Sequence, residues 1–337
     1  MASESTTTAH RSVLYDEILS WLSVSESFDR EISLLFDGTL GGGGHSSGLL
    51  RSSPRVFVVG TDCDARAIER TERRLEEFAG RYFVVQGGYQ QIREAISSMP
   101  GELTARLQQP GVSTFPQFQG LLLDLGISSD QLDDPERGFS FRYSSPLDMR
   151  MSQSDGPTAA DILNTASEHE LRLIFLRGGV KRPLHAILSK EIVRRRPFST
   201  TDQLADLCAE LERRPRKREA GPARNPATLP FQALRIEVNQ ELAKLQSFLD
   251  LAPTYLAPGG RLAVISFHSS EDKVVTQTMR RWSRRELSPF PSDDRAPFGT
   301  LLTKQAVVPS EEEIQANPRA RSARLRVFER SPNQSAH

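Results

Sequence analysis

A short apolar run near the N-terminus ends in an aspartate and leads into a glycine-rich turn. Residues 34–37 form the run and its aspartate, Gly41 to Gly44 are consecutive glycines, and His45 and Ser46 follow. Glycine lets backbone approach a bound molecule closely, and the start of a helix directs free N–H groups toward it. This order is typical of an open α/β sheet that holds a nucleotide-like ligand.

The glycine spacing excludes two common kinds of ligand site. A dinucleotide fingerprint needs G-x-G-x-x-G or A. Counted from Gly41 or Gly42, the third position holds a serine, and counted from Gly43 the second position holds His45. A phosphate-binding loop also fails, because no Gly-Lys-Ser/Thr follows the turn. The pattern therefore favours a ligand without a phosphate to grip, and S-adenosylmethionine is the common one.

Strand and helix signals alternate from residue 32 to about residue 125, which predicts a parallel sheet. The expected strands are residues 32–36, 55–61, 82–86 and 120–125. The alternation then gives way to an Arg-rich, mostly helical stretch and resumes at residue 239. A strand at 261–267 and an antiparallel pair at 299–308 and 323–330 complete the pattern. We therefore expect an α/β sheet that is interrupted by a helical insert.

Ligands of such sheets lie beyond the carboxyl ends of the strands, so residues at those ends are candidates for the site. Asp62 follows the second strand about 20 residues past the glycine turn, where a carboxylate can bridge ribose hydroxyls. Asp64 competes for this role, but its position favours capping the next helix. Tyr89 follows the third strand and either lies beside an adenine or is an ordinary core aromatic.

Asp124 ends the fourth strand and is the residue that we expect to carry chemistry. An unpaired carboxylate at such a place is costly unless it has a function, and the alternative is a helix N-cap. His45 begins a helix and is expected to position backbone or to contact the carboxylate of the ligand, not to act as a base. His268 follows the resumed strand and is either a substrate contact or a structural histidine.

The distribution of charge points to a polyanionic partner. Lys plus Arg and Asp plus Glu both total 43, but residues 177–224 hold 13 basic and 6 acidic side chains, including Arg216, Lys217 and Arg218. A solvated arginine-rich surface is the alternative interpretation. Two cysteines are too few for a zinc site or a disulfide framework, and we expect no metal. The absence of a signal peptide or long apolar run favours a soluble cytoplasmic protein.

Several ordered blocks of this chain resemble the RsmH family, also called MraW. The blocks are residues 37–39 with 43–46, 123–133, 137–141, 146–151, 231–236 and 265–269. The resemblance covers nearly the whole chain. It implies a Rossmann-like, S-adenosylmethionine-dependent enzyme that methylates the N4 amine of cytosine 1402 in the decoding region of 16S rRNA of the small ribosomal subunit.

The resemblance also implies site residues and domain limits. The cofactor contacts of the family fall on Gly43, Gly44, His45, Asp62, Tyr89, Asp124 and Gln131. Gln131 enters only through the resemblance. The methyltransferase domain is expected at 1–135 and 231–337, with an insert for RNA recognition at 136–230. A methyltransferase for DNA or protein, and a non-catalytic ribosome assembly factor, are the alternative functions.

The expected chemistry is activation of a weak nucleophile. The lone pair of the cytosine N4 amine is delocalised into the ring, and the amine loses a proton as it attacks. Asp124, with Ser128 or a backbone carbonyl, is expected to accept hydrogen bonds from that amine and to stabilise the positive charge that develops there. Asp124 can also contact the cofactor, and the sequence does not separate these roles.

Overall fold

The computed structural model describes residues 11–23, 32–107, 117–154, 156–213, 225–284 and 296–332. The chain forms two compact units, one made of Met1–Leu125 with Leu245–His337 and the other of Gly126–Lys244. Within the described ranges, no helix is both long enough and apolar enough to cross a bilayer.

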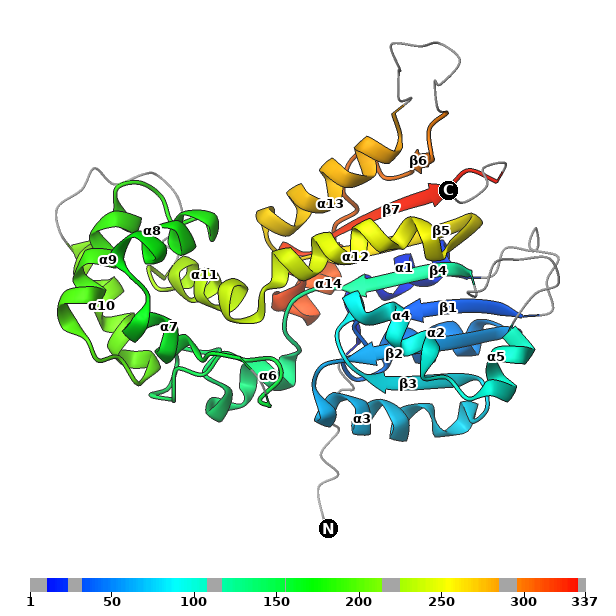
Figure 1. Cartoon of the computed structure of the whole chain (residues 1–337), viewed down its shortest axis with the longest axis horizontal. Helices are drawn as coiled ribbons and strands as arrows, with labels where there is room; N and C mark the ends of the chain where they lie inside the picture. The colour runs from blue at the N-terminus through cyan, green and yellow to red at the C-terminus, as the bar shows by residue number, and fades with distance from the viewer. Residues whose placement is uncertain are drawn as a thin grey trace. The chain divides into compact units, whose positions relative to one another are not determined.

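The first unit is built on a seven-stranded sheet with the order β3-β2-β1-β4-β5-β7-β6 (Figure 1). The strands are β1 Ser33–Asp37, β2 Val56–Asp62, β3 Tyr82–Gln86, β4 Phe118–Asp124, β5 Leu256–Ser266, β6 Gly299–Leu301 and β7 Arg324–Arg330. Strands β1 to β5 pair in parallel, whereas β7 runs antiparallel to both β5 and β6. The predicted Rossmann-like sheet, with its terminal antiparallel pair, is confirmed.

Helices cover both faces of this sheet, so the central strands are apolar at nearly every position. Leu34 and Phe36 point into a core that they share with Phe248, whereas Leu35 points into the opposite core with Leu49. The helices on the Leu35 face are α1 Tyr15–Leu22, α2 Gly44–Ser52 and α3 Ala65–Leu75. Those on the Phe36 face are α4 Ile92–Ser97, α12 Glu241–Tyr255 and α13 Ser269–Trp282. The unit also holds α5 Gly101–Leu107 and α14 Glu311–Ala316.

The second unit is a helical assembly around a core of its own, drawn in green and yellow-green in Figure 1. Its helices are α6 Ser129–Asp133, α7 Ala159–Thr165, α8 Glu168–Arg177, α9 Leu184–Arg195, α10 Thr201–Arg213 and α11 Thr228–Asn239. Ser167 caps the start of α8, because its Oγ accepts a hydrogen bond from Glu170 N. In the described part of this unit, β structure is limited to an isolated bridge between Pro146 and Thr200.

The limits of the inserted unit differ from the predicted 136 and 230. The second unit begins at Gly126 because Ile127 and Leu132 already pack against the helical core. It continues past residue 230 because α11, whose residues from Phe231 onward the prediction placed in the methyltransferase domain, buries Phe231 and Leu234 in that same core. Tertiary packing of these apolar side chains therefore sets the division.

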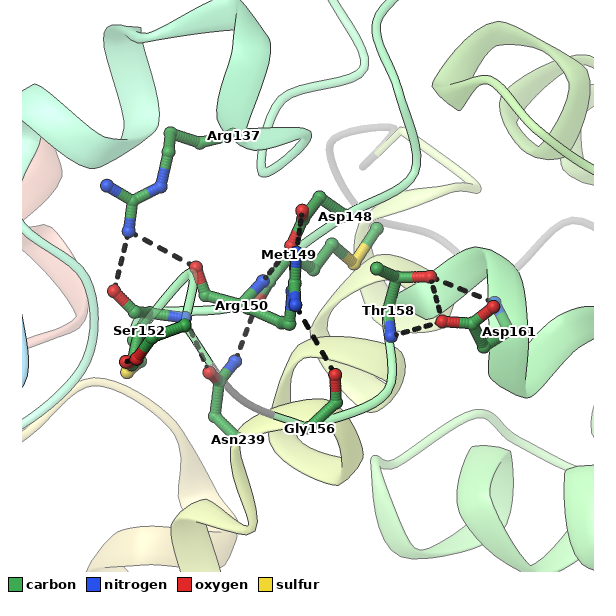
Figure 2. A network of polar contacts seen from close by, with 11 residues as sticks. Arg137, Asp148, Met149, Arg150, Ser152, Gly156, Thr158, Asp161 and Asn239 are labelled. Carbon is green, nitrogen blue, oxygen red and sulfur yellow. Dashed lines mark hydrogen bonds and ion pairs between the residues drawn. The ribbon is translucent and has the colours of Figure 1, made fainter.

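A loop in the second unit is fixed by partners far along the chain (Figure 2). Arg137 donates to the carbonyl oxygens of Arg150 at 3.2 Å and Met151 at 2.7 Å. Asn239, the last residue of α11, donates to the carbonyl of Met149 at 2.8 Å and accepts from the N–H of Met151 at 2.7 Å. These bonds hold Met149 in a left-handed conformation with φ 62°, which is unusual for a residue with a side chain. The loop is therefore rigidly positioned.

Candidate active site

Three carboxylates gather at one edge of the sheet. Asp37, Asp62 and Asp124 each end one of the three adjacent parallel strands β1, β2 and β4. The register pairs Asp37 with Gly60 of β2 and with Leu122 of β4, so the strand ends lie side by side. This edge is where the sequence predicted the site.

The glycine turn is bound to this edge by hydrogen bonds. Gly41 donates its N–H to Asp62 Oδ2 at 2.8 Å, and its carbonyl accepts from Thr71 Oγ1 at 3.2 Å. Gly41 and Gly43 have φ of 55° and 71°, a region that side chains disfavour. Gly44 begins α2, so the predicted strand, turn and helix are present. The backbone of this turn therefore requires glycine at positions 41 and 43.

Asp62 and Asp64 have different roles. Asp62 accepts hydrogen bonds from the N–H of Gly41 at 2.8 Å and of Asp64 at 2.9 Å. Burial raises the pKa of Asp62, although these two bonds oppose the rise. Asp64 caps α3, because its Oδ1 accepts from Arg66 N at 3.1 Å. The prediction that Asp64 caps the next helix is confirmed.

Replacing Asp62 with asparagine should weaken binding of S-adenosylmethionine by about 10- to 100-fold. An asparagine oxygen can accept only one of the two backbone N–H groups and carries no charge, and hydrogen bonds to a charged group contribute about 1.5–3 kcal/mol. Asp64→Asn is the matched control, since asparagine caps helices as well as aspartate does. Isothermal titration calorimetry checks both, and equal losses in the two variants would contradict the assignment.

Asp37 is buried and fully hydrogen-bonded. Its Oδ2 accepts from Ser46 Oγ at 2.6 Å, and its Oδ1 accepts from the N–H of Thr39 at 3.2 Å. Burial raises the pKa of Asp37 to about 6, against the effect of these bonds, and the charge of Asp62 adds to the rise. Asp37 therefore supports the turn and adds negative charge beside it.

Asp124 differs from Asp37 because one of its oxygens is buried without a partner. Its N–H donates to Thr39 Oγ1 at 2.6 Å, but among the described residues nothing donates to its Oδ1. Burial, and then the charges of Asp37 and Glu271, raise the pKa of Asp124 to about 8. The side chain is 25% exposed, so it remains reachable. The helix-cap alternative is wrong, because α6 is capped by Ser128.

His45 is a neutral, buried side chain that positions backbone. Its Nε2 lies 3.0 Å from the carbonyl oxygen of Val13, and its ring stacks on Tyr15 with centroids 6.3 Å apart. Burial lowers the pKa of His45 to about 4. Its Nδ1 lies 3.9 Å from Asp124 Oδ2, too far for a hydrogen bond. The expected backbone-positioning role is confirmed, and contact with a ligand stays a prediction.

Tyr89 follows β3 in the chain, packs against the core, and lies beside Gly38, the residue after β1. Its ring meets Phe248 edge-to-face at 5.8 Å, and the side chain is partly buried. A Cβ on Gly38 would lie 2.6 Å from Tyr89 Cβ and 2.5 Å from Leu123 Cδ2, so Gly38 has no room for a side chain. Tyr89 thus packs in the core as well as bordering the site, and its contact with adenine stays a prediction.

Gln131 belongs to the second unit and has a structural role there. In α6 its Oε1 accepts from the N–H of Ser128 at 3.1 Å, and its own N–H donates to Ser128 Oγ at 3.1 Å. This reciprocal cap begins the helix. The cofactor contact that the resemblance implies for Gln131 stays a prediction.

Two other expected features serve structural roles. His268 caps α13, because its Nδ1 accepts from Glu271 N at 3.3 Å, which favours the structural alternative. The arginines at 194–196, which belong to the basic stretch 177–224, bind groups of their own unit. Arg195 Nη1 lies 2.6 Å from Glu210 Oε2, and Arg196 Nε donates to the carbonyl of Leu163 at 2.7 Å. The basic residues Arg216, Lys217 and Arg218 lie outside the described residues.

Sequence reasoning missed two hydroxyl residues that order the carboxylates. Ser46 donates to Asp37 and is itself fully buried. Thr39 accepts from the backbone of Asp124 with its Oγ1 and donates its own N–H to Asp37. Both lie within residues 34–46, which hold the predicted strand end and glycine turn, but nothing in the sequence distinguishes them from the small residues beside them. The role of Thr39 depends on the pairing of β1 with β4, and that of Ser46 on the packing of α2 beside the end of β1.

The electrostatics of this edge select a class of ligand. All three strand-end carboxylates have raised pKa values, with burial the largest cause. A bound cation would relieve this accumulation of negative charge, whereas a pyrophosphate would be repelled. The sulfonium and ammonium of S-adenosylmethionine supply such a cation, so the residues present fit that group.

The comparison with known proteins agrees with this fit. The model of the MraW methylase family matches residues 7–331. A protein of Acaryochloris marina named ribosomal RNA small subunit methyltransferase H is 41% identical over 325 residues, covering 96% of this chain and 95% of its own length. Proteins of the same name from Thermobifida fusca (40% identity, 96% of this chain, 94% of its own length) and Gloeobacter violaceus (41%, 98% and 91%) are similarly close.

These matches confirm S-adenosylmethionine as the cofactor, as the turn and its carboxylates indicated. They extend over the sheet and over the inserted helical unit alike. The chain is therefore a methyltransferase that belongs to the MraW methylase family.

Proposed function

We propose that this protein methylates the N4 amine of cytosine 1402 in the decoding region of 16S rRNA. The name shared by its relatives, ribosomal RNA small subunit methyltransferase H, supports a small-subunit rRNA substrate. The observation that supports amine chemistry is that Asp124 Oδ1, near the glycine turn, has no hydrogen-bond donor among the residues that the structure describes. A carboxylate oxygen kept clear of protein donors suits a substrate that brings N–H groups of its own.

Asp124 then acts on the amine in two ways. Its carboxylate accepts a hydrogen bond from the amine, which favours a pyramidal nitrogen with an available lone pair. The same negative charge stabilises the positive charge that develops on nitrogen as the new bond forms. Because the pKa of Asp124 lies near 8 in the ligand-free protein, the carboxylate is also basic enough to take the departing proton.

The residues of the turn hold the methyl donor in reach. When bound, S-adenosylmethionine supplies an electrophilic methyl group on sulfur. Asp62 accepts from the ribose hydroxyls while it anchors Gly41, and Gly43 and Gly44 allow backbone to lie against the cofactor. Tyr89 would border the adenine, and the cofactor contact that the resemblance implies for Gln131 is part of this proposal. Holding nitrogen and methyl in line can lower the barrier by about 7–11 kcal/mol.

The second unit is proposed to bind the RNA. A cytidine must leave its stack to reach a buried carboxylate, at a cost of a few kcal/mol. Phosphate contacts from basic side chains can offset that cost, and such contacts weaken as salt rises. Arg195 and Arg196 are engaged within the unit. The stretch 213–218 therefore becomes the main candidate for phosphate contacts.

Neutralising Arg216, Lys217 and Arg218 together should weaken RNA binding and flatten its salt dependence. Removing three phosphate contacts should reduce the slope of log K against log salt by about 2. Fluorescence anisotropy with a decoding-region RNA between low and physiological salt measures the slope. Arg55→Gln with Arg73→Gln, two exposed charges of the first unit, is the control. An unchanged slope in the triple variant would favour the solvated-surface interpretation.

The reaction itself is tested on ribosomal particles. Small subunits from a strain that lacks this enzyme are incubated with the protein and S-adenosylmethionine, and their rRNA nucleosides are analysed by mass spectrometry. We expect new N4-methylcytidine located at the decoding region. Methyl transfer to a different base would reject cytosine N4 as the target. Cofactor binding with no methylated rRNA would favour a DNA or protein substrate.

A further inference from the structure

The segment Ser12–Leu14 packs directly on the start of the glycine turn and α2. A Cβ on Gly44 would lie 2.1 Å from Ser12 Oγ, so the segment occupies the space that a side chain there would need. The carbonyl oxygen of Val13 lies 3.0 Å from His45 Nε2. The N-terminal segment therefore contacts two of the predicted cofactor residues, although it lies outside the β1–α2 region that carries them.

Glu313 holds this segment in an unfavourable backbone conformation. Leu14 has φ 51°, in the left-handed region that side chains disfavour, and its side chain is fully buried. Its N–H donates to Glu313 Oε1 at 2.8 Å. Glu313 lies in the first turn of α14, where its own N–H donates to Ser310 Oγ at 3.1 Å. Such a conformation persists only where neighbouring groups fix it, and Glu313 is one of those groups.

The contact with Val13 decides which nitrogen of His45 carries the hydrogen. A carbonyl oxygen only accepts hydrogen bonds, so His45 Nε2 must donate. Since the buried imidazole is neutral, Nδ1 then carries no hydrogen. This bare nitrogen lies 3.9 Å from Asp124 Oδ2. In this tautomer His45 cannot donate to Asp124 and leaves the carboxylate to the substrate.

We infer that Glu313 is a positioning residue, which acts through the Ser12–Leu14 segment to hold His45 in the Nε2–H tautomer beside Asp124. Without Glu313, Leu14 can relax, the Val13 carbonyl moves away and His45 is free to place its hydrogen on Nδ1. An Nδ1–H group would direct its hydrogen at Asp124 Oδ2, and a small movement of the ring would let it compete with the substrate amine for this carboxylate. Only the consequence for methyl transfer rests on the proposed function; the tautomer itself does not.

The first test measures the tautomer in the ligand-free protein. Long-range ¹H–¹⁵N spectra of ¹⁵N-histidine-labelled protein distinguish the two tautomers, and His45→Gln identifies the signals. We expect the Nε2–H form in the wild type and in Glu313→Gln, which keeps an acceptor oxygen. Glu313→Ala should show a mixture of tautomers, and the shorter Glu313→Asp an intermediate mixture. If Glu313→Ala and Glu313→Asp both kept the pure Nε2–H tautomer, the inference would be wrong.

A control separates positioning from general loosening of α14. Ser310→Ala removes the cap of that helix but leaves Glu313, so it should keep the Nε2–H tautomer. A mixture of tautomers in Ser310→Ala equal to that in Glu313→Ala would mean that any damage to α14 has this effect, and would also reject the inference. These spectra need no substrate, so a failed methylation assay leaves them interpretable.

The second test reads the consequence at Asp124. In Glu313→Ala the rising limb of kcat/KM against pH should move to lower pH, because a donating His45 lowers the pKa of Asp124. Asp37 and Glu271, the charged groups that raise this pKa, are unchanged in the variant. Glu313→Gln should restore the wild-type profile. A lower rate with an unmoved limb would point to a merely structural role.

Discussion

Asp124→Asn should lower kcat for methyl transfer by about 10²- to 10⁴-fold, the range in which positioned acid–base groups contribute. Asparagine keeps the shape and the contact of the backbone N–H with Thr39, but it loses the negative charge and the basicity. Both act on the amine as it attacks, so kcat should fall far more than the binding of a ligand that lacks the sulfonium charge. Single-turnover kinetics on small subunits measure the rate, and titration with S-adenosylhomocysteine, which lacks the sulfonium charge, measures binding.

The pH profile provides the internal control for this result. In the wild type kcat/KM should rise with pH, reach half its maximum near pH 8 and level off above that, because ionised Asp124 is the active form and its pKa is about 8. The profile of kcat should level off at lower pH, because a bound sulfonium stabilises the carboxylate. Asp124→Asn should lose this limb. Full turnover in the variant, with the limb retained, would remove Asp124 from the chemistry.

Much of the site follows from local rules that a sequence shows directly. Asp62 and Asp64 are two residues apart, yet N-cap chemistry correctly assigns Asp64 to the start of α3 and strand-end geometry correctly places Asp62 beside the glycine turn, because both rules act over a few residues. Asp124 was found in the same way, as the last residue of an apolar strand. The sheet was predictable because its strands are buried on both faces and read as apolar runs.

Contacts between distant segments were not predictable from one sequence. Nothing near Val13 or Glu313 indicates that they reach His45 and Leu14, since these pairings depend on the assembled sheet. Asn239 likewise orders a loop about 90 residues earlier through bonds to Met149 (Figure 2). The compact helical unit extends beyond the predicted insert at both ends for the same reason, because the packing of side chains in a shared core sets its limits.

The same Asp124→Asn change should make the ligand-free protein more stable, by roughly 2–4 kcal/mol at pH 7.5. Folding raises the pKa of the Asp124 carboxyl to about 8. Above about pH 4 the unfolded chain carries this group ionised, and folding must either protonate it or bury its charge, which lowers the stability of the folded state. Asparagine carries no charge, and its amide can face the bare Nδ1 of His45. For a unit of this size the gain corresponds to roughly 5–10 °C in Tm, measurable by calorimetry.

Because the pKa of Asp124 is raised in the folded state, the stability difference between Asp124→Asn and the wild type should depend on pH. Below the unfolded pKa of about 4 both states of the wild type carry a neutral Asp124, so the two proteins should be equally stable. The stability of the variant relative to the wild type should increase as pH rises from about 4 to 8 and should stay constant above 8.

Asp37→Asn is the contrast: its stability should increase little, because both oxygens of Asp37 accept hydrogen bonds that asparagine cannot all replace. An Asp124→Asn variant that is less stable than the wild type at pH 8 would show that the carboxylate is not strained. A variant that is more stable but inactive would show that the fold retains a destabilising charge because the reaction requires it.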